Sequence, residues 1–199
     1  MHSILTNTSI GIIFFWCCLS NAISENINFD WNVLNAGEVI IEEIENDQGT
    51  PGVRAVFIVE ASREDIWTAL TDYVNFKKFF HDIDEMKVIS TDSNGAQVEF
   101  WADVVLMKLH YVLQRNYVKP GYHLTWNQVS GDLRDIQGSW QIRETQSSEK
   151  KLLIYESYAD LGSVVITWII RQGAKQKAKK MAYNLRNWIE SKTIPNTRE

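Results

Sequence analysis

Residues 96–106 read Ala-Gln-Val-Glu-Phe-Trp-Ala-Asp-Val-Val-Leu, a stretch in which apolar and polar side chains largely alternate. Every second position from Val98 to Leu106 is apolar, whereas Glu99 and Asp103 fall on the opposite face. A period of two is typical of a β-strand with one face on a core and the other in water. The stretch therefore predicts a half-buried strand of an antiparallel sheet.

Similar segments lie on both sides of this strand, separated by turn-forming residues such as Ser93-Asn94-Gly95 and Lys119-Pro120-Gly121. One helix interrupts them, with Ser62 as its N-cap and Asp65 three residues later, and it is expected to end near Phe76. The predicted strands are Glu38–Asn46, Val53–Ala61, Met86–Thr91, Ala96–Leu106, Leu109–Val118, His123–Val129, Ile136–Thr145 and Leu152–Ala159.

The chain then continues into a long amphipathic helix, predicted over Ser163–Ser191. Its apolar face is formed by Ile170, Ala174, Ala178, Met181, Leu185 and Trp188. We expect this face to pack on the sheet. Because a strongly twisted sheet touches a straight helix along only part of its length, the remaining apolar wall predicts a cavity between them.

Strict alternation turns a set of large side chains toward this cavity. The candidate ligand-binding residues are Phe57, Phe100, Val104, Tyr111, Arg115, Trp126, Trp140, Tyr155 and Met181. Arg115 shares a face with Tyr111 and Tyr117, and a charge there is costly unless an acidic ligand group or a carboxylate pairs with it. The alternative is that Arg115 lies on the rim, or that a bulge reverses its face.

Three segments in a fixed order carry a resemblance to a known family. They are the helix start Ala61–Trp67, the strand Gly138-Ser139-Trp140-Gln141-Ile142 and the strand Leu153-Ile154-Tyr155, and the long helix follows them. This order resembles the helix-grip superfamily of polyketide cyclases, coenzyme Q-binding proteins and START lipid-transfer domains, over Glu38–Ile189. The resemblance implies an α+β fold in which a seven-stranded antiparallel sheet wraps around the C-terminal helix and encloses a cavity for an apolar ligand. It does not imply catalysis, because the superfamily shares a fold more than a chemistry.

Residues 1–22 carry the pattern of a secretory signal peptide: the apolar run Ile10–Leu19 precedes Ser20 and Ala22, small residues at the positions that a signal peptidase reads. We expect cleavage after Ala22, a single ligand-binding domain over 23–199, and a secreted or periplasmic location. An uncleaved membrane anchor is the alternative, but the run is shorter than the ~20 residues that a spanning helix needs. Both cysteines lie inside the signal, which excludes disulfides and thiolate sites from the mature protein.

Several function classes are disfavoured by what the chain contains. A net charge of -5 gives no reason to expect a nucleic-acid partner. His81, His110 and His123 belong to no metal-binding, triad or phosphate-loop motif, so we predict no catalytic residue, metal or cofactor. His110 and His123 are expected on the outer face of the sheet, and His81 either at a pocket mouth or on the surface.

The C-terminal helix also carries a basic flank on an acidic protein. Arg171, Lys175 and Lys179 recur at helical spacing, and Arg186 continues the row. With Trp168 as an interfacial wedge, this flank suggests transient contact with an anionic membrane surface. The alternative is an ordinary solvated helix face.

Three functions from different classes follow. We favour non-enzymatic binding or transport of a lipid-like or polycyclic molecule in the cavity, because the groove is aromatic and lacks paired acid and base groups. The second is a cyclase-like or hydrolase-like enzyme that uses Arg115 and nearby tyrosines. The third is a protein-interaction module, which a large exposed apolar patch would favour.

The signal pattern makes the first testable prediction. N-terminal sequencing of the protein from its native cells should find Ile23 as the first residue, in a fraction that is free of membranes. Met1 on membrane-bound protein would instead identify the segment as an anchor.

Overall fold

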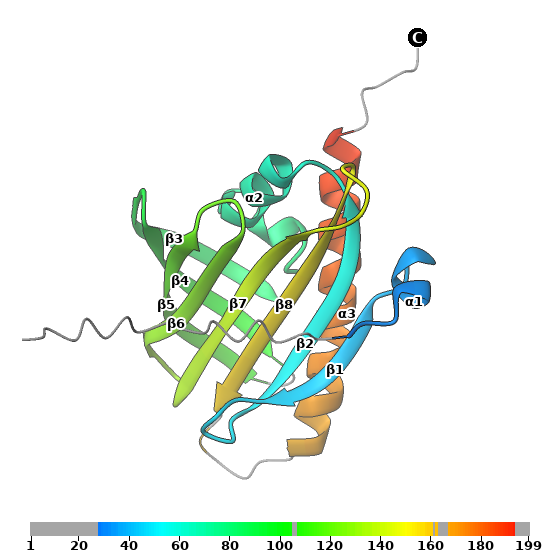
Figure 1. The fold of residues 1–199 in the computed structure, drawn as a ribbon. Coiled ribbons are helices and arrows are strands. Elements are labelled where there is room, and N and C mark those ends of the chain that lie inside the picture. Colours follow the sequence, from blue (N-terminus) through cyan, green and yellow to red (C-terminus); the bar gives the residue numbers. More distant parts are fainter. Residues whose placement is uncertain (1–27, 105–106, 161, 163–166, 194–199) are drawn as a thin grey trace, which may run out of the picture.

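The computed structural model describes residues 28–104, 107–160, 162 and 167–193 of the chain (Figure 1). The predicted signal peptide and the predicted start of the C-terminal helix at 163–166 lie outside these residues. The elements are α1 (Trp31–Asn35), β1 (Ile40–Glu45), β2 (Pro51–Glu60), α2 (Arg63–Thr71), the 3-10 helix η1 (Phe76–Lys78), β3 (Ile83–Asp92), β4 (Gly95–Val104), β5 (Met107–Lys119), β6 (His123–Gly131), β7 (Asp135–Glu144), β8 (Lys150–Asp160) and α3 (Thr167–Thr193).

The strands form one antiparallel sheet in the order β1-β2-β8-β7-β6-β5-β4-β3. The α+β architecture with a large antiparallel sheet and a long C-terminal helix is therefore confirmed, but the expected number of seven strands is wrong, because the sheet has eight. All eight predicted strand segments pair with a neighbour, which satisfies backbone N–H and C=O groups that an unpaired strand would leave unbonded.

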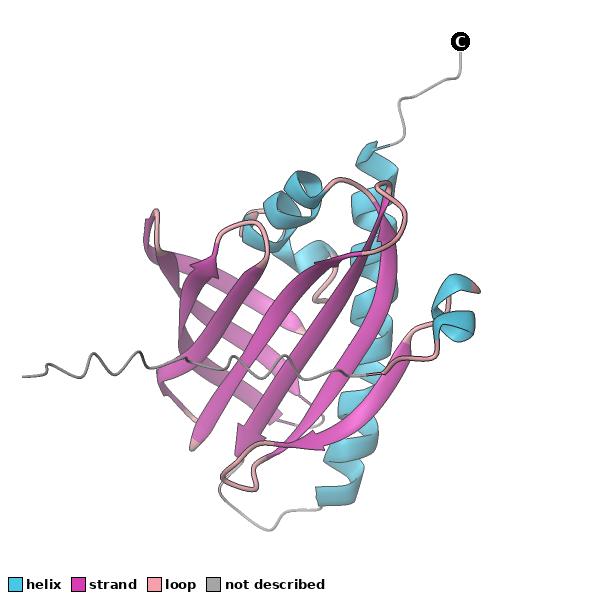
Figure 2. Ribbon diagram, in the orientation of Figure 1, coloured by secondary structure: helices cyan, strands magenta, loops and turns pink. Residues whose placement is uncertain are grey.

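The helices α2, η1 and α3 lie on one side of this sheet, which we call the inner face (Figure 2). α3 packs mainly on β2 and β1. Its buried residues are Ala178, Met181, Ala182, Leu185 and Ile189, close to the apolar face that the sequence predicts. Among the described residues, no helix combines the length and the apolar character that crossing a membrane requires.

The sheet curls strongly, so β3, β4 and β5 lie well away from β1 in Figure 1. A straight helix cannot follow such a curl. The inner face over β4 and β5 is therefore approached by α2 and η1 as well, which insert Ile66, Leu70 and Phe76 into the same core.

The outer face is also covered where β2 and β8 meet. Phe29 and Leu34, beside and within α1, pack there on Val56, Ile58 and Leu152. Strands buried on both faces read as continuous apolar runs. This explains why residues 55–59 read Ala-Val-Phe-Ile-Val without alternation. The burial of the outer face of this run was not predicted from the sequence.

Helix α2 begins as predicted, because the Ser62 hydroxyl oxygen accepts a hydrogen bond from the Asp65 backbone N–H at 3.1 Å. It ends at Thr71, however, and not near Phe76. The Asp72 carboxylate accepts from the Asn75 side chain at 2.6 Å and from its backbone N–H at 3.3 Å, which favours a turn over another helical residue. The turn separates η1 from α2.

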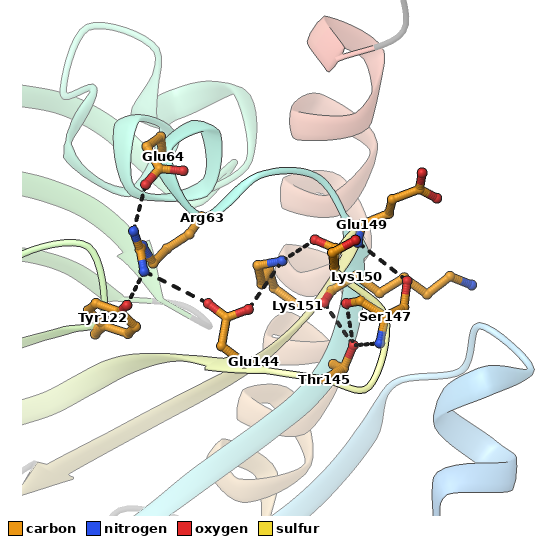
Figure 3. A network of polar contacts seen from close by, with 10 residues as sticks. Arg63, Glu64, Tyr122, Glu144, Thr145, Ser147, Glu149, Lys150 and Lys151 are labelled. Atoms are coloured by element: carbon orange, nitrogen blue, oxygen red, sulfur yellow. Dashed lines mark hydrogen bonds and ion pairs between the residues drawn. The ribbon is translucent and has the colours of Figure 1, made fainter.

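A polar network anchors the N-terminus of α2 to the β7–β8 hairpin (Figure 3). Arg63 pairs with Glu64 at 2.8 Å, donates to the Tyr122 hydroxyl and lies 3.9 Å from Glu144. The other carboxylate oxygen of Glu144 lies 3.3 Å from the buried ammonium of Lys151. Glu144 thus joins a cation on α2 to a cation on β8, which holds α2 against this end of the sheet.

The docking of α3 can be tested at Leu185, which is fully buried against the sheet. Leu185→Ala should lower the free energy of unfolding by about 2–5 kcal/mol, through lost apolar burial and the cavity left behind. The measurement is chemical denaturation followed by circular dichroism. The exposed Lys180→Ala on the same helix is the matched control and should change stability by no more than about 0.5 kcal/mol. Equal losses in both variants would contradict this packing.

Candidate functional site

A row of aromatic side chains crosses the inner face of β2, β7, β8 and β6. The ring centroids of Phe57 and Trp140 are 6.3 Å apart, those of Trp140 and Tyr155 are 4.8 Å apart, and those of Tyr155 and Trp126 are 5.7 Å apart. Such contacts add to the stability that burial alone supplies. The row forms one apolar wall of the interior.

Gly138 makes room for this row. It pairs directly with Trp126 across β6 and β7. A Cβ at this position would overlap the Trp126 ring and the backbone oxygen of Glu156. Because glycine has no side chain, the indole of Trp126 lies over β7 and reaches Tyr155 on β8.

A second aromatic group comes from η1 and β4. The Phe76 ring lies 4.5 Å from Phe80, 5.1 Å from Phe79 and 6.1 Å from Phe100. Phe100 in turn stacks on Tyr111 at 5.4 Å. The two aromatic groups face the same interior from different elements.

Arg115 lies between these groups and is only 2% exposed. Its Nη2 donates to the backbone oxygen of Leu70 at 3.1 Å, and the guanidinium lies 5.1 Å from the ring centroids of Tyr73 and Phe76. Its buried Nη1 has no hydrogen-bond partner among the described residues. Burial lowers the pKa of Arg115, because desolvation penalises the charged form.

The register explains why Arg115 faces inward. Its strand β5 pairs with β4 without interruption, so the alternation of Tyr111, Leu113 and Arg115 is kept. The irregularity in the β5–β6 ladder near Leu113 skips Val129, so the extra residue belongs to β6. The alternatives of a rim position and of a bulge that reverses the face of Arg115 are therefore wrong.

Two tyrosine hydroxyls lie close to this cation. The hydroxyl oxygens of Tyr73 and Tyr117 are 3.0 Å apart, and Tyr73 follows α2 while Tyr117 lies on β5. Burial raises the pKa of Tyr73, which keeps its hydroxyl protonated at neutral pH. Tyr73 therefore offers a hydroxyl, and not an anion, beside the guanidinium.

The structure brings most of the predicted ligand-binding residues to one inner wall. Phe57, Phe100, Tyr111, Trp126, Trp140, Tyr155 and Met181 belong to the main core or pack against it, with Arg115 among them. The side chain of Val104 lies outside the described part of the structure. Ligand contact by these residues stays a prediction.

The predicted basic flank of α3 is partly paired with carboxylates. Lys175 lies 2.7 Å from Glu43, and Lys179 lies 3.8 Å from Glu38. Arg186 donates to the backbone oxygen of Gly37 at 2.6 Å. The side chains of Trp168 and Arg171 lie outside the described residues, so membrane contact stays a prediction.

The histidines lie away from the inner wall. His110 stacks on Trp101 and lies 2.8 Å from Glu99, on the outer face, and His123 follows the same alternation. His81 is exposed, which agrees with the predicted surface position, and its Nδ1 lies 3.2 Å from the side-chain nitrogen of Asn184. Within the described ranges, no group of His, Cys, Asp or Glu side chains is arranged to hold a metal ion.

Sequence reasoning missed the contribution of the segment after α2. Phe76 and Tyr73 both face Arg115, but the prediction extended the helix through them. The available signal was Asp72 followed by Asn75, a polar pair that favours a turn. Gln128 was also missed, although it is inward by the same alternation that places Trp126.

Comparison with solved structures relates this fold to known proteins. A STAR-related lipid transfer protein from Xanthomonas axonopodis has a TM-score of 0.63 at 14% identity, covering 76% of this chain and 93% of that chain. A START superfamily protein from Mycobacterium smegmatis has a TM-score of 0.62 at 14% identity, covering 71% and 99%. An aromatase/cyclase from a Streptomyces species has a TM-score of 0.51 at 12% identity, covering 76% and 88%. At these identities the likeness concerns the fold alone.

Comparison with curated protein sequences gives no match. A family model, in contrast, matches residues 59–186, which is more than half of the chain, and its description is polyketide cyclase / dehydrase and lipid transport. The resemblance inferred from residues 61–67, 138–142 and 153–155 is thereby confirmed. The chain belongs to the polyketide cyclase / dehydrase and lipid transport family.

Proposed function

We propose that this protein binds a hydrophobic small molecule, lipid-like or polycyclic, in an internal cavity between the sheet and α3, and carries it without chemical change. The family and the fold are consistent with binding of this kind, and family members also include cyclases. The choice between carrier and enzyme therefore rests on the side chains of the inner wall.

The observation that carries the proposal is the environment of Tyr111 and Tyr155. Burial raises the pKa of both hydroxyls, because protein atoms surround them. Both side chains nevertheless keep accessible surface, whereas their neighbours Phe100, Trp126 and Trp140 are buried. Side chains that are enclosed by protein and still accessible are expected beside an internal space. Its walls would be mainly aromatic, which suits an apolar ligand.

The enzyme alternative is supported by the Tyr73–Tyr117 hydroxyl pair beside Arg115. A cyclase needs groups that both accept and donate protons in the transition state. Tyr73 and Tyr155 have raised pKa values and stay protonated, so they are poor general bases at neutral pH. Binding without chemistry is the simpler use of these groups.

We propose further that the protein acts outside the cytoplasm. The support is the pattern of residues 1–22, an apolar run followed by small residues at Ser20 and Ala22. A carrier in such a compartment would meet apolar molecules that water dissolves poorly. The interaction-module alternative stays untested.

The cavity makes a prediction about ligand uptake. The fluorescent dye N-phenylnaphthylamine should bind the purified protein at one saturable site and be displaced by oleyl alcohol. Tyr111→Trp places extra ring atoms in the proposed space. Because inserting extra atoms into a filled interior costs about 1–3 kcal/mol, the free energy of dye binding should become less favourable and the affinity should fall about tenfold. The control is Val118→Trp at an exposed position of the same strand, which should leave affinity unchanged. Equal affinity in all three proteins, or no binding, would contradict an internal site.

Carriage without chemistry makes a second prediction. After incubation with a mixed fatty-acid and phospholipid extract, mass spectrometry of the bound fraction should recover only masses present in the starting extract. A new mass that grows with time, and that is absent with heat-denatured protein, would overturn the carrier proposal in favour of the enzyme.

A further inference from the structure

The charge of Arg115 is buried without a counter-ion among the residues that the structure describes. The side chains that interact with it electrostatically are Tyr73, Tyr117 and Tyr155, none of them a carboxylate. The internal segments outside the description, residues 105–106, 161 and 163–166, contain no Asp or Glu in their sequence. None of these three segments supplies the missing negative charge.

An arginine on the opposite face of the same sheet, Arg54, is paired with carboxylates. Arg54 on β2 lies 3.1 Å from Glu42 and 2.6 Å from Glu156. It is less buried than Arg115 and yet has two carboxylate partners. A buried ion without a partner destabilises the protein, so Arg115 needs an anion more than Arg54 does.

A second unsatisfied polar group lies on the adjacent strand of the same wall. Gln128 pairs with Leu113 across β5 and β6, which makes it a diagonal neighbour of Arg115. Its Nε2 donates to the Leu133 backbone oxygen at 2.8 Å, and its buried Oε1 has no partner among the described residues. Two polar groups with unused hydrogen-bonding capacity therefore lie together on a wall that is otherwise aromatic.

We propose that Arg115 binds the anionic end of an amphipathic ligand, such as a carboxylate or sulfonate group attached to an apolar body. The inference rests on the proposed function, because the apolar body would occupy the cavity beside Tyr111 and Tyr155. Nη1 of Arg115 donates to the anionic oxygens, and Gln128 offers an acceptor to a neighbouring hydroxyl of the ligand. The ligand supplies the counter-ion that the protein lacks, so binding favours acids over neutral analogues.

The test compares two dyes of similar shape, anilinonaphthalene sulfonate and its uncharged analogue N-phenylnaphthylamine. Arg115→Met keeps the side-chain volume and removes the charge. It should weaken the sulfonate by about 10- to 100-fold, the range of a charged hydrogen bond, and change the affinity of the neutral dye by less than about threefold. Arg115→Lys should keep part of the preference for the sulfonate that Arg115→Met loses. Lysine retains the positive charge but lacks the planar set of N–H donors of the guanidinium.

Two controls separate a binding role from a structural one. Arg54→Met removes a cation from the outer face of the same sheet and should leave the ratio of the two dye affinities unchanged. Ligand-free Arg115→Met should unfold at the same temperature as the wild-type protein or a higher one, since an unpaired buried charge is removed. If near-ultraviolet circular dichroism shows that this variant is not folded, Arg115→Gln takes its place, because its amide can still donate to the Leu70 oxygen.

The outcomes distinguish this inference from the proposed function. Equal weakening of both dyes by Arg115→Met would assign Arg115 to the structure and overturn the anion site, while the cavity would stand. Failure of both dyes to bind the wild-type protein would overturn both proposals. Thermal stabilisation by sodium sulfate alone, lost in Arg115→Met, would assign the site to a small inorganic anion and overturn the amphipathic ligand.

Discussion

The architecture depends on one geometric constraint: a straight helix has to cover the inner face of a strongly curled sheet. α3 covers the inner face of β2 and β1, and its residues Leu185 and Ile189 are buried there. It cannot follow the curl to β4 and β5. The inner face there is completed by α2 and by the aromatic residues of η1, which approach from one end of the sheet. The interior between these two covers is where Tyr111, Arg115 and Tyr155 lie.

A charged residue lies in this interior. A well-packed core would place an apolar side chain opposite Trp126, and the register places Arg115 there. The guanidinium is held by the Leu70 backbone oxygen and by the faces of two aromatic rings, which compensate only part of its desolvation. The half-buried Arg54, paired with two carboxylates, and the buried Lys151, paired with Glu144, show that this sheet provides counter-ions for other cations.

Periodicity and turn residues were sufficient to predict the strands, the apolar face of α3 and the inward direction of Arg115, and the capping residue Ser62 was sufficient to predict the start of α2. Alternation is a local property, and β5 keeps it as far as Arg115 because the irregularity near Leu113 falls on β6. Three features could not be derived in this way. The turn at Asp72 depends on side-chain bonds to Asn75, α1 is only five residues long, and the double burial of β2 depends on its packing against the outer face. The hydrogen bond from Arg115 to the Leu70 backbone oxygen was also not predictable, because it joins elements that are far apart in the chain.

Because the family shares its fold among lipid-transport and cyclase proteins, the chemistry of the inner wall has to decide between binding and catalysis. The described side chains that interact electrostatically with Arg115 are tyrosines and include no carboxylate. The guanidinium cannot accept a hydrogen bond, and desolvation keeps the hydroxyls of Tyr73 and Tyr155 protonated. These groups can stabilise an anion that is already present in a ligand, but none of those described here is a base that would create one by removing a proton. This difference supports the proposal that the interior holds an acidic molecule, because activating a neutral one would require such a base.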